Sequence, residues 1–428
     1  MSIMTKKDLR QLMLYQVYVR NHTEEGTFKA LEKDLNRIKE LGTDVLYLIP
    51  IHEIGQKQKK GELGCPYSIK DFRSINPEYG TLEDFISLIK STHKSGMKIM
   101  IDVVYNHTSH DSVLIEQHPE YFYKNEQGKF SNRVGDWWDI TDLDYTKDKG
   151  LWEELISTLE YWTKLGVDGF RWDVASLLPL GFLEMAHERL VEINPDIIFL
   201  SESVHGGFVS FLRNQGFDCL SESEIYQVFD MSYDYDLHPY FEGYLKGENT
   251  FKRFLEELKR QDEVYPDNYI KMRNLENHDF GRFAPMVDNN LDKIYNWTAL
   301  AFFSKGSTMI YAGQEFLDKN KPSLFDKDLV NWDGIDISPF IAKVANLVKQ
   351  DIFSHGNHFI RTTDKDVYVG SYQYKGEEIV GIFNVGLEEG TFHIDIEDGT
   401  YENLLDKTTF TVKKGMMDLI NNPIIFRR

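Results

Sequence analysis

The feature that most constrains the fold is a repeated alternation of short apolar runs with helix-like segments along most of the chain. Eight runs have the length and composition of buried strands, and they lie near residues 15, 46, 100, 169, 198, 230, 273 and 309. Helices are expected between them, over residues 28–41, 81–95, 151–165, 182–193 and 251–260. Near-continuous apolar runs are typical of parallel strands covered on both faces. Eight such units predict an α/β fold, a (β/α)8 barrel rather than an open doubly wound sheet.

Two segments break this alternation. Residues 108–146 contain no helix-like stretch of normal length, and they are too long for an ordinary connection, so we interpret them as a short inserted subdomain or a lid. After a helix expected over residues 339–352, short alternating runs predict an antiparallel β domain. The predicted domains are a barrel over 1–107 and 147–354, an insertion over 108–146 and a C-terminal β domain over 355–428.

Composition narrows the partners. The 428 residues carry a formal charge of 48 − 69 = −21, which argues against nucleic acid or an anionic membrane and favours a neutral substrate. Two distant cysteines, Cys65 and Cys219, predict neither a disulfide framework nor a zinc site, as is usual in a reducing compartment. The N-terminus is charged where a signal peptide needs an apolar run, and no stretch approaches the ~18 apolar residues of a membrane span. We therefore expect a cytoplasmic protein.

Polar residues interrupt the apolar runs at their predicted C-terminal ends. They are Asp102 with Asn106 and His107, Arg171 with Asp173, Glu202, and Asn277-His278-Asp279. In a (β/α)8 barrel this end carries the active site, whereas polar groups at the opposite end indicate packing. Three carboxylates from three strands would converge in one pocket, and their mutual repulsion would raise the proton affinity of at least one. That arrangement supplies an acid and a nucleophile for glycoside cleavage.

Within this set, the run Gly169-Phe-Arg-Trp-Asp173 is unusual for a strand, because it carries a guanidinium two residues before a carboxylate. Strand periodicity places Arg171 and Asp173 on the same face, where the arginine would keep the aspartate ionised and fix its rotamer. Taken alone, the run is equally consistent with a buried structural ion pair.

These residues also form an ordered set of motifs, and the chain resembles the α-amylase family of retaining glycosidases, glycoside hydrolase family 13. The motifs are Asp102-Val-Val-Tyr-Asn-His107, Gly169-Phe-Arg-Trp-Asp173, Glu202 in Leu-Ser-Glu-Ser, and Asn277-His-Asp279. Shorter family-like phrases are Cys65-Pro-Tyr67, Asp142-Leu-Asp-Tyr145 and Ile310-Tyr-Ala-Gly-Gln-Glu315. The resemblance covers roughly residues 14–316. It implies a small maltodextrin-acting enzyme of carbohydrate metabolism whose partner is an α-glucan or malto-oligosaccharide; the sequence leaves the oligomeric state open.

The resemblance implies a role for each matched residue. Asp173 would be the nucleophile that forms a glycosyl-enzyme, Glu202 the acid and then the base, and Asp279 a ligand of sugar hydroxyls that favours the distorted ring. The expected substrate-binding residues are Tyr67 as a stacking platform, Asp102 ordering the pocket, and His107, Arg171, His278 and Arg282 as hydrogen-bonding groups. Retention of configuration predicts the Asp173 and Glu202 carboxyls to lie ~5–5.5 Å apart.

Several of these residues also have a purely structural interpretation. Asp102 is equally a strand-end aspartate, His107 a hydrogen-bonded core histidine, and Tyr67 a turn residue. Arg282 would contact the nucleophile or simply pair with a surface acid. We interpret Trp137 and Trp138 as core of the insertion more than as a platform for sugar.

The chain departs from many α-amylases after the nucleophile, where Ser176 and Leu177 replace a Lys-His pair that serves substrate and calcium. Asn106 matches a family calcium ligand, but partner oxygens are not evident. We therefore expect no required cofactor and no metal, with structural calcium doubtful. The leading hypothesis is hydrolysis of α-1,4 bonds in malto-oligosaccharides. The alternatives are transfer of the same intermediate to a sugar acceptor, as in 4-α-glucanotransferases, and a barrel retained only for carbohydrate binding.

Overall fold

The computed structural model describes residues 5–361 and 363–428. By its internal contacts the chain forms two compact units. One comprises Leu14–Tyr233 and Lys321–Val330 among the described residues, and the other comprises Thr5–Met13, Asp234–Asn320 and Asn331–Arg428. This division passes through the barrel, so it does not follow the predicted domain boundaries, which stay a prediction.

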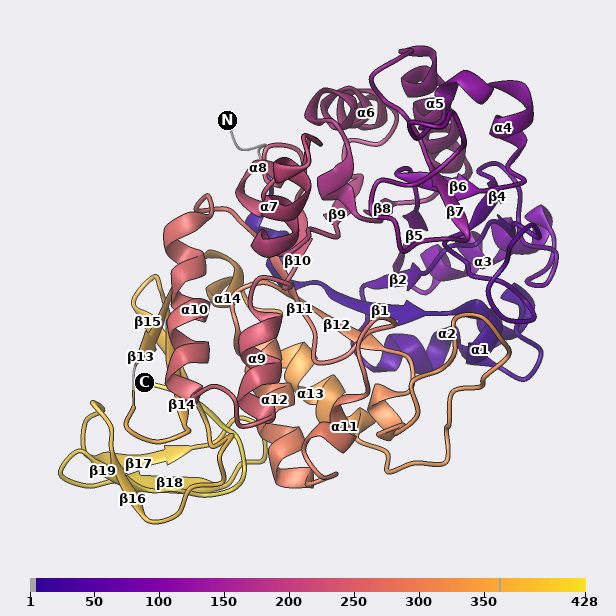
Figure 1. Cartoon of the computed structure of the whole chain (residues 1–428). Coiled ribbons are helices and arrows are strands. Elements are labelled where there is room, and N and C mark those ends of the chain that lie inside the picture. Colours follow the sequence, from indigo (N-terminus) through magenta and orange to yellow (C-terminus); the bar gives the residue numbers. More distant parts are fainter. Residues whose placement is uncertain (1–4, 362) are drawn as a thin grey trace. The chain divides into compact units, whose positions relative to one another are not determined.

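The central sheet is a closed eight-stranded parallel barrel, as predicted, with strand order β1-β12-β11-β10-β9-β8-β5-β2 (Figure 1). The barrel strands are β1 Met13–Val17, β2 Val45–Leu48, β5 Lys98–Val103, β8 Gly169–Trp172, β9 Ile198–Ser201, β10 Met231–Tyr233, β11 Lys271–Arg273 and β12 Ser307–Tyr311. Nearly every residue of these strands is buried, which explains why they appear in the sequence as unbroken apolar runs. All eight contain or adjoin the positions predicted from the sequence.

The helices follow the strands with the expected spacing. The larger ones are α2 Phe28–Glu40, α3 Leu82–Lys94, α5 Gly150–Leu165, α6 Leu180–Ile193, α7 Gly206–Asn214, α9 His238–Leu245, α10 Phe251–Val264, α12 Leu291–Phe303 and α13 Ser338–Val348. The short ones are α1 Val19–His22, α4 Val113–Gln117, α8 Glu222–Ile225, α11 Phe283–Met286 and α14 Asp351–His355. Local capping sets several ends: at α3 the Thr81 and Asp84 side chains form a reciprocal capping box. None of the helices within 5–361 and 363–428 has the length and apolar character needed to cross a bilayer.

The expected single helix over 339–352 is wrong, because the chain breaks it into α13 and α14. Gln350 has an extended backbone (φ −115°, ψ 146°), which ends the first helix and starts the second. Apolar residues continue at helical spacing across the break, so the sequence pattern does not reveal it.

The insertion is built on a small antiparallel pair, β6 His107–Ser109 with β7 Ile140–Asp142. Its helical content is the five-residue α4 and a single 3-10 turn, Pro119–Tyr121, in agreement with the expected lack of a normal helix. A second small pair, β3 Glu53–Ile54 with β4 Ile69–Asp71, follows strand β2.

The C-terminal segment is antiparallel, as predicted. One sheet has the order β13-β14-β15-β20, and two further antiparallel pairs, β16 with β19 and β17 with β18, accompany it (Figure 1). The strands are β13 Asn357–Arg361, β14 Tyr368–Tyr374, β15 Glu377–Phe383, β16 Thr391–His393, β17 Gly399–Glu402, β18 Thr409–Val412, β19 Met416–Asp418 and β20 Ile424–Arg427. Their inward residues form one apolar cluster, which includes Val380 and Phe426.

Candidate active site

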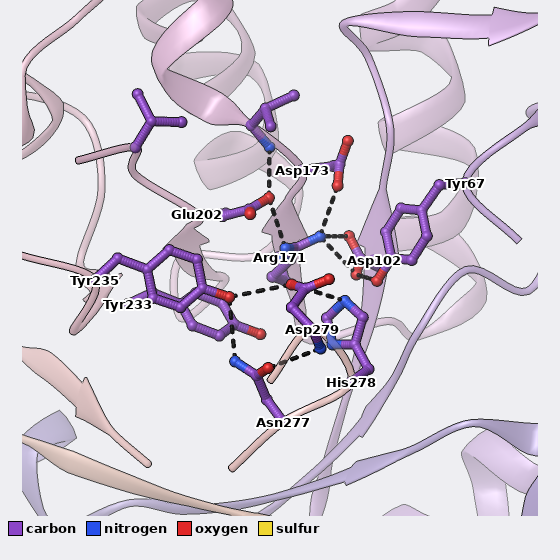
Figure 2. Close-up of polar contacts among 12 residues, drawn as sticks. Tyr67, Asp102, Arg171, Asp173, Glu202, Tyr233, Tyr235, Asn277, His278 and Asp279 are labelled. Carbon is purple, nitrogen blue, oxygen red and sulfur yellow. Dashed lines mark hydrogen bonds and ion pairs between the residues drawn. The ribbon is translucent and has the colours of Figure 1, made fainter. Parts of the chain in front are cut away.

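Arg171 is the centre of a buried charge cluster in the first unit (Figure 2). Its Nη1 donates to both oxygens of Asp102, at 2.8 and 2.9 Å, and to Oδ1 of Asp173 at 3.0 Å. Its Nη2 pairs with Oε2 of Glu202 at 2.7 Å. The predicted same-face pair of Arg171 and Asp173 is therefore present, and the same guanidinium also reaches Glu202 from the next strand.

A glycine at the start of β8 allows this strand to pack close to its neighbours and bury the Arg171 side chain. Gly169 begins β8, and a Cβ there would lie 2.9 Å from the carbonyl oxygen of Ile198 and from the Met100 side chain, so a larger residue would push the strands apart. With β8 held close to its neighbours, the Arg171 side chain is fully buried.

Electrostatics keep this arginine charged. Burial alone would lower the pKa of Arg171, but attraction to Asp102 and Glu202 outweighs it and raises the pKa well above its ordinary value. Asp102 is fully buried and accepts further hydrogen bonds from the Tyr47 and Tyr67 hydroxyls, both at 2.9 Å. One guanidinium thus faces three carboxyl groups, and burial raises the pKa of Asp102 in spite of its attraction to Arg171.

The turn after Asp173 orients Glu202. Val174 has φ +38°, a left-handed conformation that is strained for a β-branched residue. In this conformation the Val174 backbone N–H donates to Oε2 of Glu202 at 2.9 Å. This contact could not be predicted from the sequence, because a valine otherwise favours an extended backbone.

Tyr67 and His107 lie beside this cluster. The Tyr67 ring centroid is 5.7 Å from the guanidinium of Arg171, and its hydroxyl reaches Asp102. His107 begins β6 and is buried, which lowers its pKa, and its imidazole forms a hydrogen bond with the backbone of Tyr67. Tyr67 therefore contacts the charge cluster directly and His107 contacts it through the Tyr67 backbone, while their contact with a substrate stays a prediction.

The second unit holds the remaining predicted carboxylate. Asp279 follows β11, and its side chain is 40% exposed. Oδ2 accepts a hydrogen bond from the Tyr235 hydroxyl at 3.1 Å and lies 3.4 Å from Nε2 of His278, whose side chain is buried (Figure 2). Asn277 accepts from the backbone N–H of Asp279 with Oδ1 and donates to the Tyr235 hydroxyl with Nδ2.

Tyr235 was not identified from the sequence. The available signal was its position, two residues after β10, at the same end of a barrel strand as the other polar residues. Because tyrosine is common in and near strands, its presence at this position did not distinguish it from a structural residue.

Arg282 is sealed inside the second unit. Its side chain is 1% exposed, and it donates to Glu276 at 2.6 Å and to Asp318 at 3.0 Å. Its remaining donors reach the carbonyls of Ala312 and Asn320. The acids that pair with Arg282 are thus buried and not at the surface, and its predicted contact with sugar or nucleophile stays a prediction.

Asn106, the residue that matches a family calcium ligand, is already engaged with a buried carboxylate. Asn106 donates to Oδ1 of Asp142 at 3.4 Å, and Oδ2 of Asp142 accepts from the backbone N–H and guanidinium of Arg133, at 2.9 and 3.2 Å. A guanidinium therefore supplies the cation for this buried carboxylate, so the set does not fit a calcium ion. Across residues 5–361 and 363–428, no group of three or more His, Cys, Asp or Glu side chains is arranged to hold a metal.

Comparison with known families and structures identifies the chain's relatives. Residues 16–351 match the alpha amylase catalytic domain, and residues 359–426 match the bacterial alpha amylase C-terminal domain. A crystal structure of an alpha-amylase from Lactobacillus plantarum is 41% identical, with a TM-score of 0.96, over 99% of this chain and 100% of that chain. A maltogenic alpha-amylase from Thermotoga neapolitana is 30% identical, with a TM-score of 0.87, over 98% and 99%.

Curated relatives match over shorter stretches. The alpha-1,4-glucan:maltose-1-phosphate maltosyltransferases of Salinibacter ruber and Picrophilus torridus are 31% and 32% identical, over 43% and 50% of this chain. The aligned stretches span 31% and 39% of those proteins, about a third of their length. The catalytic-domain match covers most of the barrel and includes every predicted site residue, and the C-terminal match covers the antiparallel sheet. The chain belongs to the alpha-amylase family.

Proposed function

We propose that this protein is a retaining glycosidase that cleaves α-1,4 bonds in malto-oligosaccharides or related α-glucans. The observation that carries the proposal is that Asp173 and Glu202, from the ends of adjacent strands, share one guanidinium and still reach solvent. Their side chains are 10% and 14% exposed, whereas Asp102 in the same cluster is sealed. Two neighbouring carboxyl groups that a substrate can reach are what a double-displacement reaction at an anomeric carbon requires.

In the first step, an Asp173 oxygen bonds to the anomeric carbon while the bond from that carbon to the leaving oxygen breaks. Glu202 gives its proton to the leaving oxygen. In the second step Glu202 takes a proton from water, whose oxygen replaces Asp173 at the anomeric carbon. Asp279 is proposed to hold sugar hydroxyls and to favour the distorted ring of the transition state.

The shared guanidinium supports the switch in the protonation of Glu202. Arg171 is shared by Asp102, Asp173 and Glu202, so an ionised Asp173 competes with Glu202 for the guanidinium, and Glu202 is the most accessible of the three to a substrate. When Asp173 becomes an ester it loses its charge, and the attraction of Arg171 for an ionised Glu202 then increases. We propose that this coupling prepares Glu202 as an acid before the first step and as a base before the second.

Transfer of the glycosyl group to a sugar acceptor is the second candidate. The curated relatives are named maltosyltransferases, and transfer uses the same intermediate with a sugar hydroxyl in place of water. Incubation with maltotriose separates the two activities. Hydrolysis gives glucose and maltose with a steady gain in reducing ends. A ladder of longer maltodextrins without that gain would establish transfer, and no change in the maltotriose would contradict both.

We also propose that the reaction needs no metal. The pairing of Arg133 with Asp142 supports this, because the buried carboxylate already has its counter-charge. Dialysis against EDTA is expected to leave both kcat and the thermal unfolding midpoint unchanged. Loss of either one, with recovery after addition of calcium, would contradict the proposal.

A location in the cytoplasm completes the proposal. Cys65 and Cys219 are both free thiols and both buried, which suits a reducing compartment. Burial raises the pKa of the Cys65 thiol to about 12, so it stays protonated and inert. Fractionation of the source cells tests the location: the activity should remain with the cytosolic fraction and not appear in the medium.

A further inference from the structure

Trp138 is an exposed indole in the insertion, contrary to the expectation that it forms core. Its side chain is 55% exposed. Within residues 5–361 and 363–428, no other tryptophan is among the exposed large hydrophobic residues. A single exposed hydrophobic side chain needs no ligand to explain it, so the case for one at Trp138 depends on how the ring is held and where it lies.

One cation lies beside the indole, and further contacts hold that cation and the backbone of Trp138. The Lys60 ammonium lies 5.6 Å from the centroid of the Trp138 ring, and it pairs with Oδ1 of the buried Asp139 at 2.7 Å. The same ammonium lies 5.9 Å from the ring of Phe325. His110 donates from Nε2 to the Trp138 carbonyl at 3.0 Å. A surface ring that is anchored in this way loses little freedom when a ligand binds to it.

A series of contacts within the first unit joins the two sequence neighbours of Trp138, Trp137 and Asp139, to the carboxylates. Tyr67 donates to Asp102, and the backbone of Tyr67 holds the His107 imidazole. The His107 ring packs against Trp137, the neighbour of Trp138, with centroids 5.7 Å apart. The next residue after Tyr67, Ser68, donates from its hydroxyl to the carbonyl of Asp139 at 3.0 Å. The platform and the reaction centre are therefore parts of one packed structure.

We propose that Trp138 is a stacking platform for a glucosyl unit of the α-glucan chain, outside the ring that reacts. The inference rests on the proposed function and adds to it a determinant of chain-length preference. A pyranose ring has an apolar C–H face, which packs well on the electron-rich face of an indole. The Lys60 ammonium holds the ring by a cation–π contact and satisfies its own charge through Asp139, so it does not require an anionic ligand.

The test compares Trp138→Ala with Trp138→Phe over the series maltotriose to maltoheptaose. In the alanine variant, KM for maltoheptaose is expected to rise about five- to ten-fold, with a smaller rise for each shorter substrate and little change in kcat. The phenylalanine variant keeps an aromatic face and should recover a large part of the loss. Phe359→Ala is the matched control: this aromatic ring in β13 of the C-terminal sheet is 47% exposed, and its removal should leave the series unchanged.

Binding gives a readout independent of turnover. Calorimetric titration of maltoheptaose into Asp173→Asn, with and without Trp138→Ala, should show affinity weaker by the same factor as the change in KM. An equal effect on every chain length, or none, overturns the platform while the wild-type protein still turns over maltodextrins. Absence of turnover in the wild-type protein overturns the proposed function instead, and the titration then still decides whether Trp138 binds a glucan.

Discussion

Two arginines of this protein, Arg171 and Arg282, are equally buried and each pairs with buried carboxylates, yet they differ in what surrounds the pair. Arg282 uses Nε and both Nη atoms, and its acids Glu276 and Asp318 are 2% and 1% exposed. Arg171 leaves Nε without a hydrogen-bond partner among the residues that the structure describes, and two of its three acids reach solvent.

This difference distinguishes the structural cluster around Arg282 from the cluster around Arg171, which we propose to be reactive. Each guanidinium faces more than one acid, so the balance of charge does not distinguish the two clusters. The nitrogens of Arg282 are all engaged and its acids are sealed, whereas Arg171 has an orphaned donor and holds two carboxyls that solvent reaches. Burial of charge alone therefore does not identify a candidate catalytic residue, and the proposal for Asp173 and Glu202 depends on their partial exposure.

Removal of the reactive carboxyls should give the largest effect on activity. We expect Glu202→Gln to lower kcat by roughly 10²- to 10⁴-fold, since it deletes general acid–base catalysis, and Asp173→Asn to lower it at least as much. Both changes remove one of the three acids that share Arg171, so thermal unfolding should shift little or upward. Activity assays with a maltodextrin and calorimetric melting measure the two quantities. A variant that melts early and stays active would place Arg171 in the same class as Arg282.

For Arg282 and its two acids we expect a loss of stability, where the variants of Asp173 and Glu202 lose activity. Arg282→Met leaves Glu276 and Asp318 as uncompensated buried charges, which should cost about 3–5 kcal/mol in the free energy of unfolding. Denaturant unfolding of the variant and of the milder Arg282→Lys measures this loss. Normal stability with a raised KM would instead support the sugar contact predicted for Arg282 and would remove the distinction between the two arginines.

The buried imidazole of His52 should make the stability of the protein depend on pH under acid conditions. Burial lowers the pKa of His52 to about 4, and its Nδ1 donates to the Ser74 carbonyl. Because the unfolded chain binds the proton more tightly, with a pKa near 6.5, stability is complete above that pH and is lost as the pH falls toward 4. The loss from this group at pH 5 should be about 2 kcal/mol.

The variant His52→Gln removes the titration while keeping a donor for Ser74. Unfolding midpoints measured from pH 7 to pH 4.5 should fall less steeply in the variant than in the wild-type protein. Parallel curves would show that the acid sensitivity does not come from this histidine.

The smallest expected effect concerns Asp279, an exposed carboxyl that accepts a hydrogen bond from the Tyr235 hydroxyl. Tyr235→Phe removes one hydrogen bond to its Oδ2 but keeps the aromatic packing on Phe280. Solvent competes at this site, so we expect a fall in kcat of about three- to ten-fold, with KM and stability nearly unchanged. A pH–rate profile should shift in the same variant; a change in melting temperature alone would assign Tyr235 a structural role.

Much of the fold and the candidate site could be predicted from the sequence, because the relevant signals are local. The unbroken apolar runs identified all eight barrel strands, and period-2 geometry placed Arg171 beside Asp173. The break at Gln350 and the strained turn at Val174 were not predictable, since in each case neighbouring parts of the chain override the local preference.

The sequence alone determined which residue types stand at the ends of the barrel strands, and so it determined the family and the candidate chemistry. The tertiary structure decided the environment of each: that Arg282 is sealed between two acids, that Tyr235 supports Asp279, and that Trp138 is exposed although it is as hydrophobic as any core residue. The physical reason is that burial and pairing are set by residues distant in the chain, such as Asp318 for Arg282 and Phe325 for Lys60. No periodicity or motif encodes those distances.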